Sequence, residues 1–292
     1  MAPATEGVPL EVVVVVEAAV VVANTNTHTE EPNFSIISPG GCNAICSFCT
    51  DPMNYKYNHQ TYISKLAIAL LEKDPKFNRV SITGGEPTLS KLLTEILQLS
   101  RHFFDKVVFT TNGTRLRLHQ KLIADHIDHL NVSRHAIGYE DNTKVFHTKQ
   151  IINDEDLKET IKFFLSRGVD VNINHVYGPQ DSFVTEDYVR RFIQYCHQLG
   201  ATSISFRYDQ NFNNLGHTEI EKVFLAQYPI VRKGSCAVCR NFSMIIDDMT
   251  VVWKSSFANP EEHMNGEIYE YVFHTDGELR TGWVNPNLRN LE

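Results

Sequence analysis

From residue 33 to residue 209, short β-rich runs alternate with longer amphipathic stretches, and this alternation constrains the fold more than any other feature. Six strands are predicted, at 34–38, 79–83, 106–111, 129–133, 170–176 and 202–208. Helices are predicted between them, at 62–73, 88–103, 118–126, 154–167 and 185–199. Strands that alternate with helices indicate βα units and a parallel sheet. Six units cannot close an eight-stranded barrel, so we expect an α/β fold, a partial (β/α)6 TIM-like barrel.

The domain boundaries follow from where this rhythm starts and stops. Residues 1–32 are predicted to be a valine-rich N-terminal extension and linker, because their apolar run is shorter than the roughly 20 residues of a membrane-spanning helix. Residues 33–209 are predicted to form the partial barrel itself. After Asp209 the rhythm breaks, so residues 210–292 are expected to form a small C-terminal β appendage. Its strand-like runs lie at 242–246 and 250–254.

Composition and charge narrow the class of protein. A chain with 42% hydrophobic and 21% charged residues is typical of an ordinary folded protein. Its net charge of −8 argues against general binding of nucleic acid phosphates or of an anionic membrane. Six cysteines are too sparse for a disulfide scaffold, and the first basic residue is Lys56, so the basic head of a secretory signal is missing. We therefore expect a cytoplasmic protein.

Three cysteines follow the first predicted strand in a C-x3-C-x2-C run, at Cys42, Cys46 and Cys49. Three thiolates at this spacing can hold one compact metal centre. A [4Fe–4S] cluster has four irons, so three protein thiolates leave one iron open for another ligand. The alternative is a zinc site with His59 as the fourth ligand, although structural zinc usually takes its ligands as two separated pairs. The spacing therefore favours an iron–sulfur cluster.

A glycine-rich turn follows the second predicted strand, with Gly84, Gly85, Glu86 and Pro87 just before a helix. Glycines at the carboxyl end of a strand allow a ligand to approach the backbone closely. The freed amides and carbonyls there can hold a carboxylate or an ammonium group. As an isolated tetrapeptide this would be a common turn, but after a cysteine loop it is highly specific.

With this cysteine spacing, the aromatic Phe48 before the last cysteine and the Gly-Gly-Glu-Pro turn, the chain resembles the radical S-adenosylmethionine (radical SAM) superfamily over about residues 33–209. The resemblance implies that the three cysteines bind a [4Fe–4S] cluster. It implies that Gly84, Gly85 and Glu86 meet the methionine amino group of SAM, and that Phe48 lies beside the adenine. It also implies an enzyme that cleaves SAM reductively to a 5′-deoxyadenosyl radical, which abstracts a substrate hydrogen, with a reductant such as flavodoxin or ferredoxin.

Polar residues near the carboxyl ends of the later strands are expected to point at SAM or at the substrate. The candidates for cofactor contacts are Thr111, Asn112, Ser133 and Asn174, and the candidates for catalytic or substrate contacts are Arg134, His135, Arg207 and Asp209. By the resemblance, Ser133 would lie near the SAM carboxylate and Asn174 would reach the SAM ribose. Because an arginine can bind a carboxylate bidentately, Arg134 is predicted to clamp an anionic substrate group. Each candidate is also explained by an ordinary capping or loop role.

A second cysteine pair, Cys236 and Cys239, lies in the C-terminal region. This stretch resembles the C-terminal segment of the molybdenum-cofactor GTP cyclase branch, in which a third cysteine completes an auxiliary cluster site. Here that place falls at or near Trp253, so a complete three-cysteine site is absent from the segment. A second metal or cluster, a reversible disulfide and free thiols all remain open for the pair. This resemblance therefore implies a shared architecture, and the missing third cysteine argues against GTP cyclisation as the reaction.

The function expected from these motifs is that of a radical SAM enzyme acting on a small polar metabolite, a nucleoside-like molecule or a peptide. One alternative is an activase that installs a glycyl radical on a partner protein and shares the same core. A second alternative is a non-catalytic iron–sulfur or zinc binding module. Formation of 5′-deoxyadenosine separates the two enzymes from the binding module.

Overall fold

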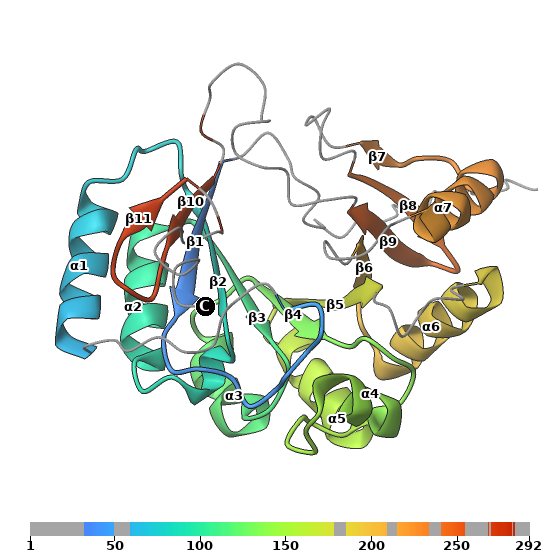
Figure 1. Ribbon diagram of the computed structural model, residues 1–292, viewed down its shortest axis with the longest axis horizontal. Helices are drawn as coiled ribbons and strands as arrows, with labels where there is room; N and C mark the ends of the chain where they lie inside the picture. The colour runs from blue at the N-terminus through green and yellow to red at the C-terminus, as the bar shows by residue number, and fades with distance from the viewer. Residues whose placement is uncertain are drawn as a thin grey trace, which may run out of the picture.

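The computed structural model of the chain describes residues 32–49, 59–177, 185–208, 215–233, 241–254, 268, 270–281 and 283. Its strands form one curved sheet (Figure 1). The six predicted strands are all present as β1 (Asn33–Ser38), β2 (Arg79–Gly84), β3 (Lys106–Thr111), β4 (His129–Ser133), β5 (Asp170–Tyr177) and β6 (Ser203–Tyr208). They lie in chain order and each runs parallel to the next. The expected α/β partial barrel is therefore confirmed.

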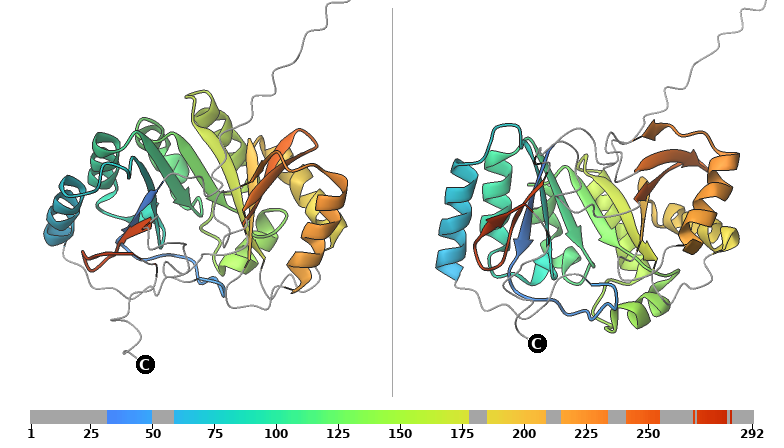
Figure 2. Two further views of the ribbon diagram at one scale, coloured as in Figure 1. Left: turned by 90° about the horizontal axis from the view of Figure 1, so that it is seen from above. Right: turned by 45° about the horizontal axis from the view of Figure 1, so that its top comes forward.

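Helices connect these strands and lie along the outside of the curved sheet (Figure 2). They are α1 (His59–Leu71), a 3-10 turn η1 (Pro87–Leu89), α2 (Leu93–Phe103), α3 (Leu116–Ala124), α4 (Tyr139–Phe146), α5 (Asp154–Leu165) and α6 (Glu186–Leu199). Helix α5 shows why they form. The side chain of Asn153 caps its first turn by accepting from Asp156 N, and acidic residues there favour the positive end of the helix dipole. Leu157, Ile161 and Phe164 recur at helical spacing and are fully buried against the sheet.

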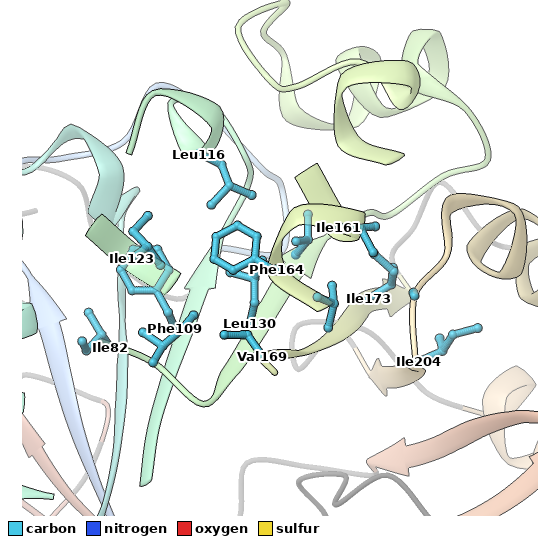
Figure 3. Close-up of a cluster of buried hydrophobic side chains, with 14 of the residues drawn as sticks. Ile82, Phe109, Leu116, Ile123, Leu130, Ile161, Phe164, Val169, Ile173 and Ile204 are labelled. Atoms are coloured by element: carbon cyan, nitrogen blue, oxygen red, sulfur yellow. The ribbon is translucent and has the colours of Figure 1, made fainter. Parts of the chain in front are cut away.

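Apolar side chains fill the space between the sheet and the helices. Figure 3 shows one such side chain from each of β2 to β6, namely Ile82, Phe109, Leu130, Ile173 and Ile204, together with helix residues such as Leu116, Ile123, Ile161 and Phe164. All of these side chains are completely buried. Since side chains alternate between the two faces of a strand, the residues between them face the opposite, inner face of the sheet.

The inner face is polar and closely hydrogen bonded. Asn172 donates to Asn131 Oδ1 at 3.0 Å and to Asn174 Oδ1 at 2.9 Å. Ser203 donates to Asn172 Oδ1 at 2.9 Å. These four side chains are buried, whereas the inside of a closed TIM barrel is usually packed with branched apolar residues. The inner face is therefore suited to a polar ligand.

The C-terminal strands extend both edges of this sheet and do not form a separate layer. They are β7 (Arg232–Lys233), β8 (Phe242–Ile246), β9 (Met249–Lys254), β10 (Glu270–Phe273) and β11 (Leu279–Arg280). Strand β9 runs parallel to β6 and β10 runs parallel to β1, which gives eight consecutive parallel strands in the described chain. Helix α7 (Leu215–Gln227) lies where the βα rhythm was expected to break. The expected appendage is thus integrated into the barrel wall, because every residue of β9 is buried as in an interior strand.

Several predicted features lie outside the described residues. They are the valine-rich extension at 1–31, Asp209 and the pair Cys236 and Cys239. Among the helices that are described, none has the length and apolar character needed to cross a membrane.

Candidate functional site

The cysteine loop lies directly against the turn that follows β2. The backbone N–H of Glu86 donates to the carbonyl oxygen of Gly41 at 2.9 Å. At Gly85 a Cβ atom would collide with this same carbonyl oxygen, so only glycine permits the approach. The two motifs that the sequence analysis singled out are therefore parts of one site.

The three cysteines of this loop differ in exposure. Cys42 and Cys46 are partly buried, and Cys49 is exposed. The backbone N–H of Ala44 donates to Cys42 Sγ at 3.4 Å. Burial raises the pKa of Cys42 and, together with the neighbouring thiols, raises the pKa of Cys46 to about 12. Thiolates are the metal-binding form, so the positive charge of a bound metal centre is what would hold these groups ionised.

The donor set, three cysteine thiols on one loop, fits an iron–sulfur cluster. Cysteine thiolates are the ligands that iron–sulfur clusters take. In the described part of the chain, no three His, Cys, Asp or Glu side chains converge closely enough to hold one metal ion. The side chain of His59, the alternative zinc ligand, lies outside the described residues.

The turn after β3 also contacts the cysteine loop. Asn112 Nδ2 donates to Asn43 Oδ1 at 3.1 Å and lies 4.0 Å from Cys42 Sγ. Asn43 Nδ2 in turn donates to Thr114 Oγ1 at 2.8 Å. Asn112 is a site residue predicted from the sequence, whereas Asn43 and Thr114 are not. Their signal is that short polar side chains in turns commonly bond to neighbouring loops and backbone.

Glu86 ties the turns after β2 and β3 together through its buried carboxylate. Its Oε1 accepts from Thr88 N at 3.0 Å, from Thr88 Oγ1 at 2.6 Å and from Thr111 Oγ1 at 2.6 Å. Its Oε2 accepts from Asn112 N at 2.7 Å. Burial raises the pKa of Glu86, and these hydrogen bonds offset part of that rise. Since Oε2 accepts one bond here, it has capacity for a second donor.

Phe48 of the cysteine loop lies beside His135, which follows β4. The two ring centroids are 4.6 Å apart in an edge-to-face arrangement. The backbone N–H of Val176 donates to His135 Nδ1 at 3.0 Å, so the ring proton is on Nε2. Burial lowers the pKa of His135 well below its usual value, with repulsion from His175 and Arg134 in the same direction. His135 is therefore a neutral ring with an Nε2–H donor beside the cysteine loop.

Helix α4, which the sequence analysis did not predict, supports the cysteine loop from the outside. The backbone N–H of Ile45 donates to the carbonyl oxygen of Phe146 at 3.0 Å. Ala44 packs with Phe146 and Ile151 in a small apolar cluster that Cys42 and Cys46 adjoin. The loop is thus held between the sheet turns and this helix.

Arg134 has a different environment from the one predicted. The alternation along β4 puts it on the outer face with Leu130, and it is completely buried. Its guanidinium donates to the carbonyl oxygens of Asn112, Ser133 and Ile152 at 3.2, 2.8 and 2.7 Å. Burial lowers the pKa of Arg134. The predicted clamp on a substrate anion does not fit this geometry, because the guanidinium donates to three backbone carbonyl oxygens of the protein itself.

Ser133 and Asn174 are neighbours on β4 and β5, on the inner face. The side-chain oxygen of Asn174 is engaged by Asn172 at 2.9 Å. The amide group of Asn174 therefore has its N–H groups left to offer to a ligand. The structure brings this predicted pair together at the same level of the sheet.

Arg207 is a partly buried residue near the end of β6, and Lys254 is its neighbour on β9. Burial lowers the pKa of Arg207, while attraction from Glu270 acts in the opposite direction. Arg207 is a site residue predicted from the sequence, whereas Lys254 is not. The signal for Lys254 is a charged residue two positions after Val252, on the face of a strand that points inwards.

Comparison with known proteins identifies the family. The model of the radical SAM superfamily matches residues 36–196. A Saccharolobus islandicus protein named Probable GTP 3′,8-cyclase is 33% identical over 169 residues, which cover 56% of this chain and 52% of that protein. A Sulfurisphaera tokodaii protein of the same name is 35% identical over 132 residues, 41% of this chain and 40% of that protein. The chain spans about half the length of the curated relatives it matches.

A solved structure supports the same fold. The crystal structure of Streptococcus suis SuiB bound to precursor peptide SuiA matches with a TM-score of 0.61 and 12% sequence identity. The match covers 86% of this chain and 59% of SuiB, and at this identity it speaks for the fold alone. The family model covers more than half of this chain, including the cysteine loop and the glycine turn. This chain is therefore a member of the radical SAM superfamily.

Proposed function

We propose that this radical SAM enzyme binds a [4Fe–4S] cluster at Cys42, Cys46 and Cys49, with SAM beside it, and abstracts a hydrogen atom from a polar substrate. The observation that carries the proposal is the direct contact between Gly41 and Glu86, which joins the cysteine loop to the glycine turn. Such a site needs both a metal-binding loop and a backbone that a ligand can approach closely.

The chain's own residues would bind and orient SAM. The turn at Gly84 and Gly85 offers exposed backbone groups, and Glu86 Oε2 can accept from the ammonium of the methionine moiety. Ser133 and the amide N–H groups of Asn174 would donate to the carboxylate and the ribose. Phe48 would contact the adenine. When bound, the cluster and SAM supply the electron transfer and the 5′-deoxyadenosyl radical that removes the substrate hydrogen.

The inner face of the sheet would hold the substrate. Its buried side chains are amides, hydroxyls and basic groups, which suits a small polar metabolite or a nucleoside-like molecule. His135 Nε2–H and Arg207 are the substrate contacts that we propose. The named relatives are GTP 3′,8-cyclases and SuiB was crystallised with a peptide, so nucleotides and peptides are the first classes to assay.

The proposal is tested with protein reconstituted anaerobically with iron and sulfide. We expect about four irons per chain, a change in the electron paramagnetic resonance spectrum on adding SAM, and 5′-deoxyadenosine on reduction with flavodoxin, ferredoxin or dithionite. Cys49→Ala should lose all three results. Cys196→Ala is the matched control, because this cysteine is buried in α6 outside the loop. Zinc in place of iron, or a spectrum that SAM does not change, would overturn the proposal.

The same measurement decides the role of the second cysteine pair. A second cluster at Cys236 and Cys239 would raise the iron content above four per chain, and the excess would disappear in the double alanine variant. An iron content that is unchanged in the double variant would leave the pair without an iron site. Formation of a stable radical on a partner protein, when the enzyme is incubated with cell extract, would favour the activase alternative.

A further inference from the structure

Basic side chains gather on the inner face of the sheet, outside the motifs described above. They are Arg79 on β2, Lys106 on β3, His129 on β4, Arg207 on β6 and Lys254 on β9. All five share the face that carries the buried amides, because each lies an even number of residues from Ser81, Val108, Asn131, Ser205 or Val252 in its own strand. Repulsion from Arg79 lowers the pKa of both His129 and Lys254, so these three side chains, from three strands, lie within electrostatic reach of one another.

Lys254 is the unusual member of this group. It is the last residue of β9, and its side chain is 8% exposed. Within the described chain its ammonium has no hydrogen-bond or ion-pair partner. Burial lowers the pKa of Lys254 far below its usual value, and repulsion from Arg207 and Arg79 adds to the shift. A buried ammonium group without a partner is costly to a fold.

The carboxylates on the same face do not neutralise Lys254. In the described strands they are Glu270 and Asp170. Glu270 accepts from Asn33, Ser35 and Trp283 at 3.0, 2.8 and 3.0 Å, and its attraction acts on Arg207. Asp170 lies at the start of β5 and interacts with Lys106. Among the described residues, the charged groups that act on Lys254 are Arg207 and Arg79, and both are positive.

We propose that the inner face binds an anionic group of the substrate, a carboxylate or a phosphate, with Lys254 as its direct ligand. This inference rests on the proposed function, because the anion would belong to the molecule that loses the hydrogen atom. Lys254 and Arg207 lie side by side near the carboxyl ends of their parallel strands, which is where folds of this kind bind ligands. An anion there would supply the partner that Lys254 lacks and balance the repulsion from Arg79 and Arg207.

The direct test is a titration of the cluster-reconstituted protein with inorganic phosphate and, separately, with malonate, followed by calorimetry. We expect saturable 1:1 binding of one of the two probes, and the probe that binds identifies phosphate or carboxylate. Lys254→Met should weaken this binding by roughly 10- to 100-fold, the value of one hydrogen bond to a charged group. Lys158→Met is the matched control, because Lys158 is exposed on α5, and it should bind the probe as the wild type does.

Thermal unfolding supplies an independent readout that a purely structural lysine would not give. Without an anion, Lys254→Met should melt about 2–4 °C higher than the wild type, because it removes a buried charge. When the binding probe is added, the melting temperature of the wild type should rise more than that of the variant. The inference is overturned when neither probe binds the wild type, or when Lys254→Met binds the probe as tightly as the wild type does.

The failure of this inference is distinguishable from the failure of the proposed function. The same wild-type preparation is assayed for 5′-deoxyadenosine formed from SAM. Cleavage of SAM without anion binding overturns the anion site alone. Anion binding without SAM cleavage supports the anion site and overturns the proposed radical chemistry.

Discussion

Two basic side chains are buried on opposite faces of the same sheet. Arg134 on the outer face is completely buried and donates to three backbone carbonyls. Lys254 on the inner face is 8% exposed and has no such donor contact in the described structure. Burial lowers the pKa of both, but Asp154 and Tyr195 attract the guanidinium, whereas Arg207 and Arg79 repel the ammonium. Burial of a basic residue is therefore weak evidence for a ligand site, and the partners of the residue decide its role.

The same contrast separates the two halves of the candidate site. Around the cysteine loop, Glu86 and Arg134 each form several hydrogen bonds with protein groups and hold neighbouring turns together. On the inner face, no described protein group pairs with the ammonium of Lys254, and in our proposal a bound anion does. The first region is organised before any ligand arrives, and the second becomes electrostatically balanced only when a ligand binds.

The largest effect is expected from Arg134→Met. This change removes the donor to the carbonyl oxygens of Asn112, Ser133 and Ile152 at once, and buried acceptors without donors are costly. We expect the free energy of unfolding to fall by about 3–5 kcal/mol. Urea unfolding measures this loss, and Lys254→Met, which should gain stability, is the partner variant. A loss below about 1 kcal/mol would remove the distinction between the two faces.

A smaller loss in the free energy of unfolding is expected from Glu86→Gln. This change tests a buried carboxylate that is hydrogen-bonded to protein groups, as Arg134→Met tests a buried guanidinium. The amide nitrogen of glutamine would replace an oxygen that accepts from Asn112 N or from Thr88 and Thr111. A donor would then face a donor, and we expect a loss of about 2–3 kcal/mol in urea unfolding. The exposed Glu95 on α2 gives the control Glu95→Gln, which should change stability by less than about 0.5 kcal/mol. Equal stabilities of the two variants would show that the hydrogen bonds of the Glu86 carboxylate do not stabilise the turns after β2 and β3.

The sequence pattern predicted the six parallel strands because β-rich runs and amphipathic helices alternate regularly there. It joined residues 88–103 into one helix, whereas the structure has η1 and then α2. The reason is local. The side chains of Glu86 and Ser90 accept from the backbone N–H groups of Thr88 and Leu92, which competes with a continuous helix. The pairing of β9 with β6 and of β10 with β1 could not be predicted from the sequence, because it joins segments that lie far apart along the chain.

The candidate site was predictable where a motif is contiguous and less so where it depends on strand parity. The cysteines and the glycine turn are each a short contiguous run that the sequence shows directly, and the structure brings the two runs into contact. Arg134 was assigned to a ligand because it ends a strand, although Leu130 and Val132 share its parity and are apolar. Lys254 shares its parity with Thr250 and faces inwards. Counting the alternation through the last residue of each strand would have corrected the first assignment and found the second residue.

The smallest of the expected effects depends on pH and concerns His129, on the inner face of the sheet. Burial lowers the pKa of His129 to about 3, and repulsion from Arg79, Lys254 and Lys106 contributes, while a hydrogen bond with Asn131 opposes the shift. Asp170 is its register partner on β5. The unfolded chain binds this proton below its usual pKa of 6.5 and the folded chain does not, so stability falls as the pH is lowered from about 6.5 towards 3.

His129→Gln should remove this part of the acid sensitivity while its amide can still donate to Asn131. Relative to the wild type, the variant should gain about 2 kcal/mol between pH 7.5 and pH 5 in urea unfolding. His102→Gln, an exposed change on α2, should leave the difference between the two pH values unaltered. A phosphate or malonate ion bound at Lys254 would counter the repulsion and raise the pKa of His129, so the gain should shrink when the probe is present. If the acid sensitivity is the same in the wild type and in His129→Gln, the lowered pKa of His129 that burial and the neighbouring positive charges produce is wrong.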